Sequence, residues 1–150
     1  MLRKLSPLQA GTLGELLAVA KLNTLGLAAY ISPEGAPGHD IIAIVAGLPK
    51  SIEVKTRQFL LRPSEITRWP VDMAAKGDAD FFLFVELDLR KMEPTFYLLT
   101  NEQARSSHKD YQGSGNCVPS AVRKLANPND FSLIVPANWP LDLAGPGDAP

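Results

Sequence analysis

The chain has 150 residues, an apolar fraction of 45% and a formal net charge of −1. A chain of this length can bury one hydrophobic core, and its near-neutral charge argues against a strongly basic protein that binds nucleic acid without specificity. The single cysteine, Cys117, excludes an internal disulfide bond and is typical of a reducing cytoplasmic compartment.

The longest apolar run, residues 81–85, is far shorter than the roughly 20 residues that a membrane helix requires. We therefore expect a cytoplasmic protein without a membrane segment. Residues 1–139 are expected to form one domain. Residues 140–150 contain Gly, Pro and Asp without periodicity, which predicts a loosely ordered tail.

The first helix is expected to begin after Ser6, which caps it, with Pro7 at the first helical position and Gln9 completing a capping box. Gly26 is expected to end the helix. The face that packs on the core is predicted to comprise Leu13, Leu16, Leu17, Ala20 and Thr24.

Two glycines, Gly11 and Gly14, lie inside this helix, where each lowers helix stability by up to about 1 kcal/mol. Close packing on a sheet or on a phosphate backbone would account for them. Glu15 lies off the packing face. It could form a second capping box with Thr12, but the start at Ser6 is the better one, so we expect Glu15 to assist at a site beside the helix.

Three strands are expected next. The first covers residues 27–31 and leads into a loop rich in Pro and Gly, residues 32–38. The second, residues 41–45, is apolar throughout. The third, residues 51–57, alternates, with apolar side chains on one face and charged side chains on the other, namely Glu53, Lys55 and Arg57.

The second and third strands are expected to form a hairpin. A turn centred on Ala46 and Gly47 pairs residues whose numbers add up to 93, and so places Asp40 opposite Glu53 on the same side of the sheet. Residues 47–50 could instead form a longer loop with a different register.

Opposed carboxylates destabilise a sheet unless a positive charge lies between them. Mg²⁺ takes oxygen ligands and is typically held by one or two carboxylates and a substrate phosphate, so Asp40 and Glu53 are candidate ligands. Lys55 lies on the same face and could orient an attacking water or stabilise charge on a transferring phosphoryl group. The alternative is a hairpin whose charged face is solvated.

The order of these motifs resembles the PD-(D/E)xK nuclease superfamily. A helix with Gly-x-x-Gly-Glu precedes an acid that opens one strand, and Glu-x-Lys lies on the next. The layout is most similar to archaeal Holliday-junction resolvases and Mrr-like restriction endonucleases. The resemblance covers roughly the first 60 residues and is carried by Gly11, Gly14, Glu15, residues 37–40 and residues 53–55. His39, not proline, precedes Asp40, which changes the loop but not the ligands.

This resemblance implies an α/β protein with the restriction-endonuclease-like α/β/α sandwich and a central mixed sheet. It implies a divalent-metal-dependent DNA endonuclease that hydrolyses phosphodiester bonds with a metal-activated water. Mg²⁺, for which Mn²⁺ would substitute, would be held by Asp40, Glu53 and the Val54 carbonyl. Lys55 would orient or activate the water, and Glu15 would assist. A homodimer acting on duplex or branched DNA is expected.

Two alternatives remain open. The first is a catalytically inactive nuclease-fold module that binds nucleic acid or a protein partner. The second is an unrelated α/β protein in which Glu-x-Lys occurs by chance.

Basic residues cluster in sequence around the candidate site, although the chain as a whole is slightly acidic. We expect Lys50, Arg57 and Arg62 to bind phosphates, and Gln58 to contact the backbone of a substrate. A solvated face is the alternative for Arg62 and for Arg68.

The second half of the chain alternates strands and helices. Residues 65–69 could start a helix, with Trp69 in the core or stacked on a base. A central strand buried on both faces is predicted at 80–87, with its neighbour at 95–100. Asn101 is predicted to cap a helix that runs to about residue 109.

The last expected elements are short. Residues 113–116 are predicted to be a flexible loop. A helix is expected at 120–125, and a last strand at 131–135, with Trp139 packed nearby.

Overall fold

The computed structural model describes residues 2–33, 39–111 and 114–135, except for the side chains of Lys76, Tyr111 and Ser114. The predicted tail at 140–150 and Trp139 lie outside the described residues, as does most of the predicted loop at 32–38. No helix in the described ranges is long and apolar enough to cross a membrane.

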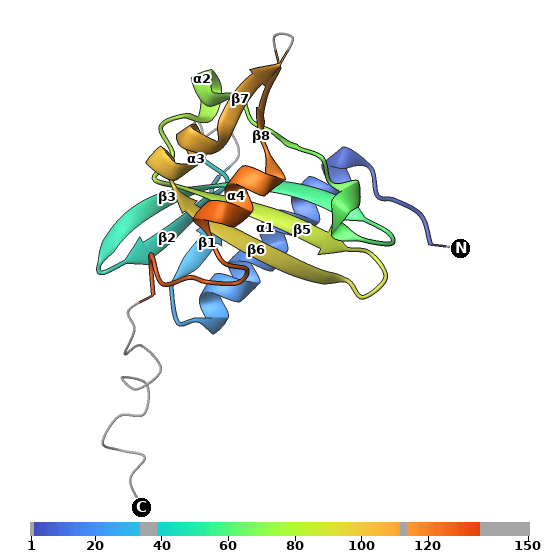
Figure 1. Cartoon of the computed structure of the whole chain (residues 1–150). Coiled ribbons are helices and arrows are strands. Elements are labelled where there is room, and N and C mark those ends of the chain that lie inside the picture. The colour runs from blue at the N-terminus through green and yellow to red at the C-terminus, as the bar shows by residue number, and fades with distance from the viewer. Residues whose placement is uncertain (1, 34–38, 112–113, 136–150) are drawn as a thin grey trace, which may run out of the picture.

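A mixed sheet of five strands forms the centre of the molecule, in the order β1-β2-β3-β5-β6. Strands β3 and β5 are parallel, and the other neighbouring pairs are antiparallel. The sheet confirms the predicted α/β class with a central mixed sheet (Figure 1). Its strands are β1 (Ala29–Ile31), β2 (Ile41–Val45), β3 (Leu48–Phe59), β5 (Phe81–Asp88) and β6 (Glu93–Thr100).

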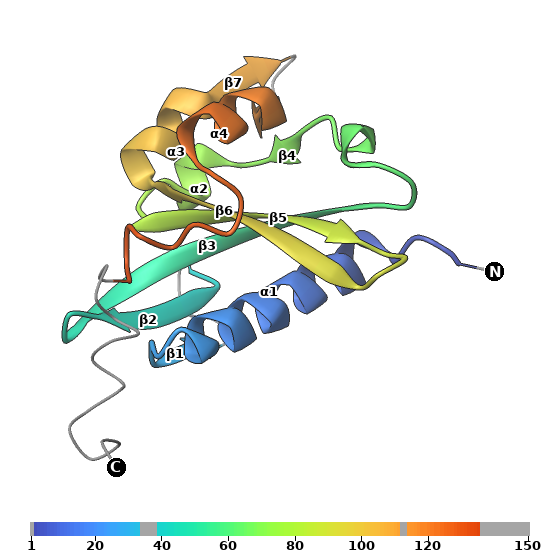
Figure 2. The ribbon, with the colours of Figure 1, turned by 60° about the horizontal axis from the view of Figure 1, so that its bottom comes forward.

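Figure 2 shows one long helix below this sheet and a layer of short elements above it. The helix is α1 (Pro7–Thr24). The upper layer includes η1 (Pro63–Glu65), α2 (Met73–Lys76), α3 (Asn101–Ser107), α4 (Pro119–Leu125) and a small sheet of β4 (Trp69–Pro70), β8 (Ser114–Cys117) and β7 (His108–Tyr111).

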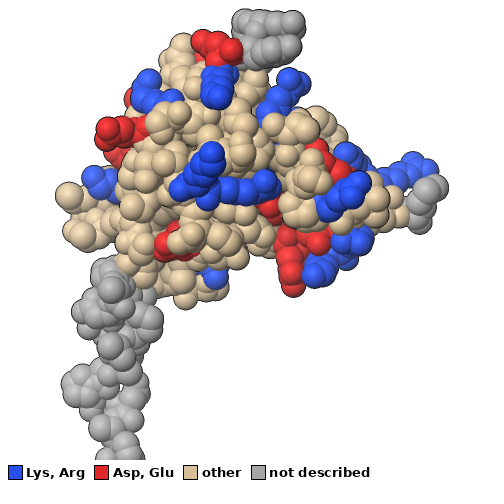
Figure 3. Space-filling model, in the orientation of Figure 1, with Lys and Arg blue, Asp and Glu red and all other residues tan. Residues whose placement is uncertain are grey.

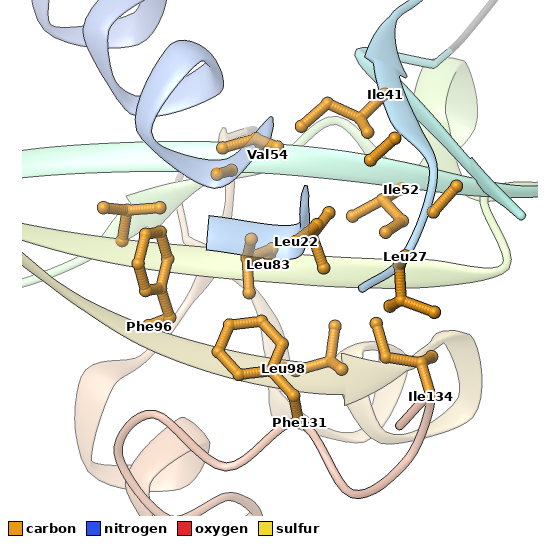
Figure 4. Packing of buried hydrophobic residues seen from close by; sticks show 14 residues of the cluster. Leu22, Leu27, Ile41, Ile52, Val54, Leu83, Phe96, Leu98, Phe131 and Ile134 are labelled. Carbon is orange, nitrogen blue, oxygen red and sulfur yellow. The ribbon is translucent and has the colours of Figure 1, made fainter. Parts of the chain in front are cut away.

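The two faces of the sheet bury separate apolar clusters. The cluster between α1 and the sheet includes Leu22, Ile52 and Leu83, and the segment after α4 adds Phe131 and Ile134 (Figure 4). The second cluster lies between the sheet and the upper layer, with Phe82, Phe84, Trp69, Tyr97 and Val122 among its members. The sheet is therefore covered on both faces, as in an α/β/α sandwich.

The predicted start of α1 is confirmed. The Ser6 hydroxyl accepts from the Gln9 amide at 3.1 Å, the Ser6 amide donates to Gln9 Oε1 at 3.1 Å, and Pro7 is the first helical residue. Gly26, with a φ of 85°, follows the last turn. These are local interactions, so the sequence alone specifies them.

The predicted packing face of α1 was wrong except for Leu17, which packs against the core. Leu16 is 51% exposed, and the buried residues are instead Ala10, Gly14, Ala18 and Leu22. Small side chains occupy this face because the helix lies close to β3. A Cβ atom built on Gly14 would lie only 1.7 Å from the Thr56 hydroxyl. Close packing on the sheet therefore accounts for Gly14, whereas Gly11 has no atom within 4 Å of an added Cβ.

The hairpin has the predicted register. Ala46 and Gly47 have φ angles of 51° and 80°, as in a type I′ turn, and Ile41 pairs with Ile52. The longer loop considered for residues 47–50 does not form, because β3 already begins at Leu48.

Two predictions around residues 65–109 were wrong. The helix suggested at 65–69 is absent, since η1 ends at Glu65 and β4 begins at Trp69, which is buried in the core. Thr100, not Asn101, caps α3, with its hydroxyl accepting from the Gln103 amide. The Asn101 amide instead donates to two carbonyls before β5, and residues 108–111 leave the helix to form β7.

Two predictions near the end of the described chain were also wrong. Residues 114–117 form β8 rather than a flexible loop, because they pair with β4 and β7. Residues 131–135 form a helical turn rather than a strand, in which the Phe131 carbonyl accepts from the amides of Ile134 and Val135. Phe131 and Ile134 are buried, so the apolar pattern of this segment indicated burial but not a strand.

Candidate metal and nucleic-acid site

The candidate site lies where β3 outlasts its antiparallel neighbour. β2 pairs with β3 only as far as Ile52, whereas β3 continues to Phe59 along β5. Residues 53–59 of β3 therefore have no strand beside them on the β2 side within the described chain. Backbone amides and carbonyls at such an edge are available to side chains and ligands.

Asp40 lies at this edge, immediately before β2. Its Oδ2 accepts a hydrogen bond from the Val54 amide at 2.8 Å. The N–H and C=O of one strand residue point to the same side, so the Val54 carbonyl faces the same edge as Asp40. The Asp40 carboxylate and this carbonyl are thus placed beside each other by the backbone itself.

Glu53 and Lys55 extend from the face of β3 that points away from α1, beside Phe82 and Phe84 of β5. Lys55 Nζ lies 2.9 Å from Glu53 Oε1, and the two side chains are 25% and 1% exposed. Burial of a carboxylate among aromatic rings is unfavourable unless it is paired, and Lys55 supplies a positive charge for it. The strict alternation of residues 51–57 produces this arrangement.

One cavity of about 400 Å³ brings the predicted catalytic residues together. Gly11 and Glu15 of α1 line one side of it, and Trp69 and Pro70 of β4 line another. Figure 2 shows β3 running between these two elements. The remaining lining residues are Pro7, Asp40, Glu53, Val54, Lys55, Thr56 and Arg57.

The donors of this cavity suit a hard cation. Across the parts of the chain that are described, no group of three or more His, Cys, Asp or Glu side chains is arranged to hold a metal ion. Mg²⁺ needs only one or two carboxylates, completed by waters and phosphate oxygens. Asp40, Glu53 and the Val54 carbonyl are all oxygen donors and fit it.

The predicted nucleic-acid contacts fall in different places. Arg57 lines the cavity, and its Nε donates to the Arg68 carbonyl at 3.2 Å. Gln58 lines an adjoining cavity of about 220 Å³ and binds the backbone of Leu5. Lys50 and Arg62 line neither cavity.

Some residues of the site were not predicted from the sequence. Pro7, Thr56 and Pro70 line the cavity, and Trp69 forms part of its wall while its ring is buried. Trp69 Nε1 donates to the Val85 carbonyl at 3.2 Å, so this ring is fixed in the core. Only its aromatic character marked Trp69 in the sequence, and that feature does not separate a wall residue from a core residue.

Comparison with known proteins identifies the fold. No protein family matches the sequence, and no curated protein matches it. The structure is similar to that of the bacterial homing endonuclease I-Ssp6803I, with a TM-score of 0.59 and 14% identity over 93% of this chain and 99% of the other. It is also similar to Archaeoglobus fulgidus Hjc, a Holliday junction resolvase from an archaeal hyperthermophile. That match has a TM-score of 0.51 and 18% identity over 83% of this chain and 94% of the other. The chain therefore shares the fold of these two structures, a restriction-endonuclease-like fold with a central mixed sheet.

Proposed function

We propose that this protein is a divalent-metal-dependent DNA endonuclease. The observation that carries the proposal is the convergence of Asp40, Glu53, the Val54 carbonyl and Lys55 on one cavity at the open edge of β3. Two similar structures are those of nucleases, a homing endonuclease and a Holliday junction resolvase. Fold similarity alone does not establish an activity, so the proposal depends on the site.

Asp40, Glu53 and the Val54 carbonyl would hold Mg²⁺ or Mn²⁺. The ion would supply Lewis acidity and a bound water that loses a proton near neutral pH. Hydrolysis forms a bond between phosphorus and the water oxygen, and breaks the bond to the leaving oxygen, which gains a proton.

Lys55 and Glu15 would act on this water. Lys55 carries three N–H donors and, once separated from Glu53, would donate to the attacking water or to a phosphate oxygen. Glu15 lines the same cavity from α1 and would accept a hydrogen bond from the water. Both would thereby align the nucleophile with the phosphorus.

Arg57 is the strongest candidate for a phosphate contact. Its bond to the Arg68 carbonyl fixes the direction of the guanidinium beside the cavity. Lys50 and Arg62 would contact phosphates farther along a duplex. The face in Figure 3 carries Lys and Arg interspersed with Asp and Glu.

We further propose that the protein acts as a homodimer on duplex or branched DNA, because symmetric pairs of subunits match substrates with two strands to cut. A nuclease-fold module that binds DNA without cutting it is the second candidate. The ion pair between Glu53 and Lys55 favours this candidate, since it satisfies both charges without a metal.

A cleavage assay separates the two candidates. Duplex, single-stranded, flap and four-way-junction DNA would be incubated with Mg²⁺ or Mn²⁺ and with the parent chain, Lys55→Ala, or the control Lys124→Ala on α4. We expect cleavage by the parent and by the control, and none by Lys55→Ala. DNA that is shifted in a gel but never cut would support the binding module. Equal cleavage by all three proteins would contradict the assignment of this site.

A further inference from the structure

Gln58 makes a paired contact with the segment that precedes α1. The Leu5 amide donates to Gln58 Oε1 at 2.8 Å, and Gln58 Nε2 donates to the Leu5 carbonyl at 2.7 Å. One side-chain amide thus reproduces the two bonds that a pair of residues on adjacent strands would exchange. Both atoms with which Gln58 could contact DNA already have partners.

This contact lies on the face of β3 that supports α1. Val54, Thr56 and Gln58 alternate along that face, where Thr56 lies against Gly14 and Gln58 binds Leu5. Leu5 directly precedes the capping residue of the helix. Pro7 and Gly14 are seven residues apart, which corresponds to about 10 Å along a helix. The helix is therefore attached to β3 near its start and again at Gly14.

The body of α1 is held by its buried residues Ala10, Gly14, Ala18 and Leu22, whereas the segment before its first turn is held by the bonds from Gln58. Pro7 and Gly11, in the first turns, line the cavity that holds Asp40 and Glu53. The position of these first turns therefore sets the distance between this wall and the carboxylates.

We propose that Gln58 is a positioning residue, which holds the start of α1 against the open edge of β3 and so fixes the helical wall of the site. The inference rests on the proposed function, and it gives Gln58 a role other than the DNA contact expected from the sequence. Leu5 and Gln58 act as one unit.

A double-mutant cycle tests whether the two residues act together. The parent chain, Leu5→Pro, Gln58→Met and the double variant would be compared. Leu5→Pro removes the N–H donor but leaves the Gln58 side chain able to reach DNA. The measurements are amide hydrogen exchange in the first turns of α1, Mn²⁺ affinity by calorimetry and affinity for duplex DNA, all well below Tm.

Each single variant is expected to speed exchange at the start of α1 about tenfold, as for the loss of one or two hydrogen bonds, and to weaken Mn²⁺ binding several-fold. The double variant is expected to be no worse than Gln58→Met. If the effects of the two single variants on the exchange rate multiply in the double variant, the two residues act independently and the inference is overturned. DNA affinity that is lost in Gln58→Met but kept in Leu5→Pro would show a direct contact of Gln58 with DNA and would also overturn it. Faster exchange without any change in Mn²⁺ affinity would overturn it too.

Gln58→Glu supplies a conservative variant. A protonated carboxyl has an O–H donor and an acceptor oxygen and so can make both bonds to Leu5, as the amide does, whereas a carboxylate only accepts. The exchange rate of Gln58→Glu at the start of α1, divided by that of the parent at the same pH, is therefore expected to approach one as the pH falls. A ratio that does not change with pH would contradict the paired contact. A parent chain that binds no Mn²⁺ would count against the proposed function, while the exchange data would still decide whether Gln58 holds α1.

Discussion

Lys55 Nζ lies 2.9 Å from Oε1 of Glu53, the buried carboxylate that is proposed to hold the metal. An ammonium and a divalent cation compete for one carboxylate. Lys55→Met is therefore expected to bind Mn²⁺ at least as tightly as the parent, while DNA cleavage falls about 100-fold or more. Calorimetry and single-turnover cleavage check the two quantities. A marked loss of Mn²⁺ affinity would show that Lys55 supports the metal site instead.

Asp40 is expected to contribute its charge to metal binding and its Oδ2 to the fold. In Asp40→Asn the side-chain oxygen can still accept from the Val54 amide, so Tm should change little, but Mn²⁺ affinity is expected to fall at least about tenfold. Asp80→Asn is the matched control. Asp80 accepts from the amide and hydroxyl of Ser51 and does not line the cavity. An asparagine oxygen can still accept both bonds, so the loss of this charge should change neither Tm nor Mn²⁺ affinity markedly.

The two glycines of α1 are expected to respond in opposite ways to alanine. Gly14→Ala forces a Cβ into the Thr56 hydroxyl, and is expected to lower the free energy of unfolding by about 1–3 kcal/mol. Gly11→Ala meets nothing within 4 Å, so the higher helix propensity of alanine should raise it by up to about 1 kcal/mol. Urea denaturation measures both. Stabilisation by Gly14→Ala would refute the close approach of α1 to β3.

Arg57 is expected to bind one phosphate. Arg57→Gln should weaken DNA binding regardless of sequence and reduce the slope of log affinity against log salt by about 1. Lys124→Gln removes the same charge on α4 and serves as the control. Fluorescence anisotropy over a range of salt concentrations provides the slopes, and equal slopes for the two variants would argue against a phosphate at Arg57.

The hydrogen bonds of Glu65 are expected to make the stability of the protein depend on pH. Its carboxylate accepts from the amides of Arg62, Leu61 and Leu60, and these hydrogen bonds hold its pKa below the ordinary value of 4.5. A lowered pKa in the folded state stabilises the fold above pH 4.5, and the stabilisation is lost as the pH falls through the lowered pKa. Glu65→Gln should therefore have a lower Tm than the parent at pH 7, with the difference shrinking in acid. Glu93→Gln, at the exposed start of β6, removes the same charge and serves as the control.

The sequence predicted features that depend on neighbours along the chain. The capping box of Ser6 and Gln9 joins residues three positions apart. The turn at Ala46 and Gly47 fixes a register in which alternation alone decides which side chains of β3 share a face. The placement of Asp40 beside the Glu53–Lys55 segment follows from this turn and from the alternation, so the arrangement of these residues was predictable in outline.

Features that depend on distant partners were not predictable. The buried face of α1 has a glycine at position 14 because Thr56, on another element, lies against it. The strand at 114–117 forms only because residues 69–70 and 108–111 lie beside it. Gln58 and Leu5 are 53 positions apart, so nothing near Gln58 in the sequence indicates that its amide is engaged.

The unequal lengths of β2 and β3 also bear on self-association. An unpaired strand edge can accept a strand from another molecule and so lead to aggregation. Here α1 and the segment at Leu5 pack on the face of β3 beside that edge, and the charges of Asp40, Glu53 and Lys55 disfavour an apolar strand there. The same opening can thus remain accessible to a charged ligand while it excludes a polypeptide, so substitutions that neutralise these charges carry a risk of aggregation as well as a loss of binding.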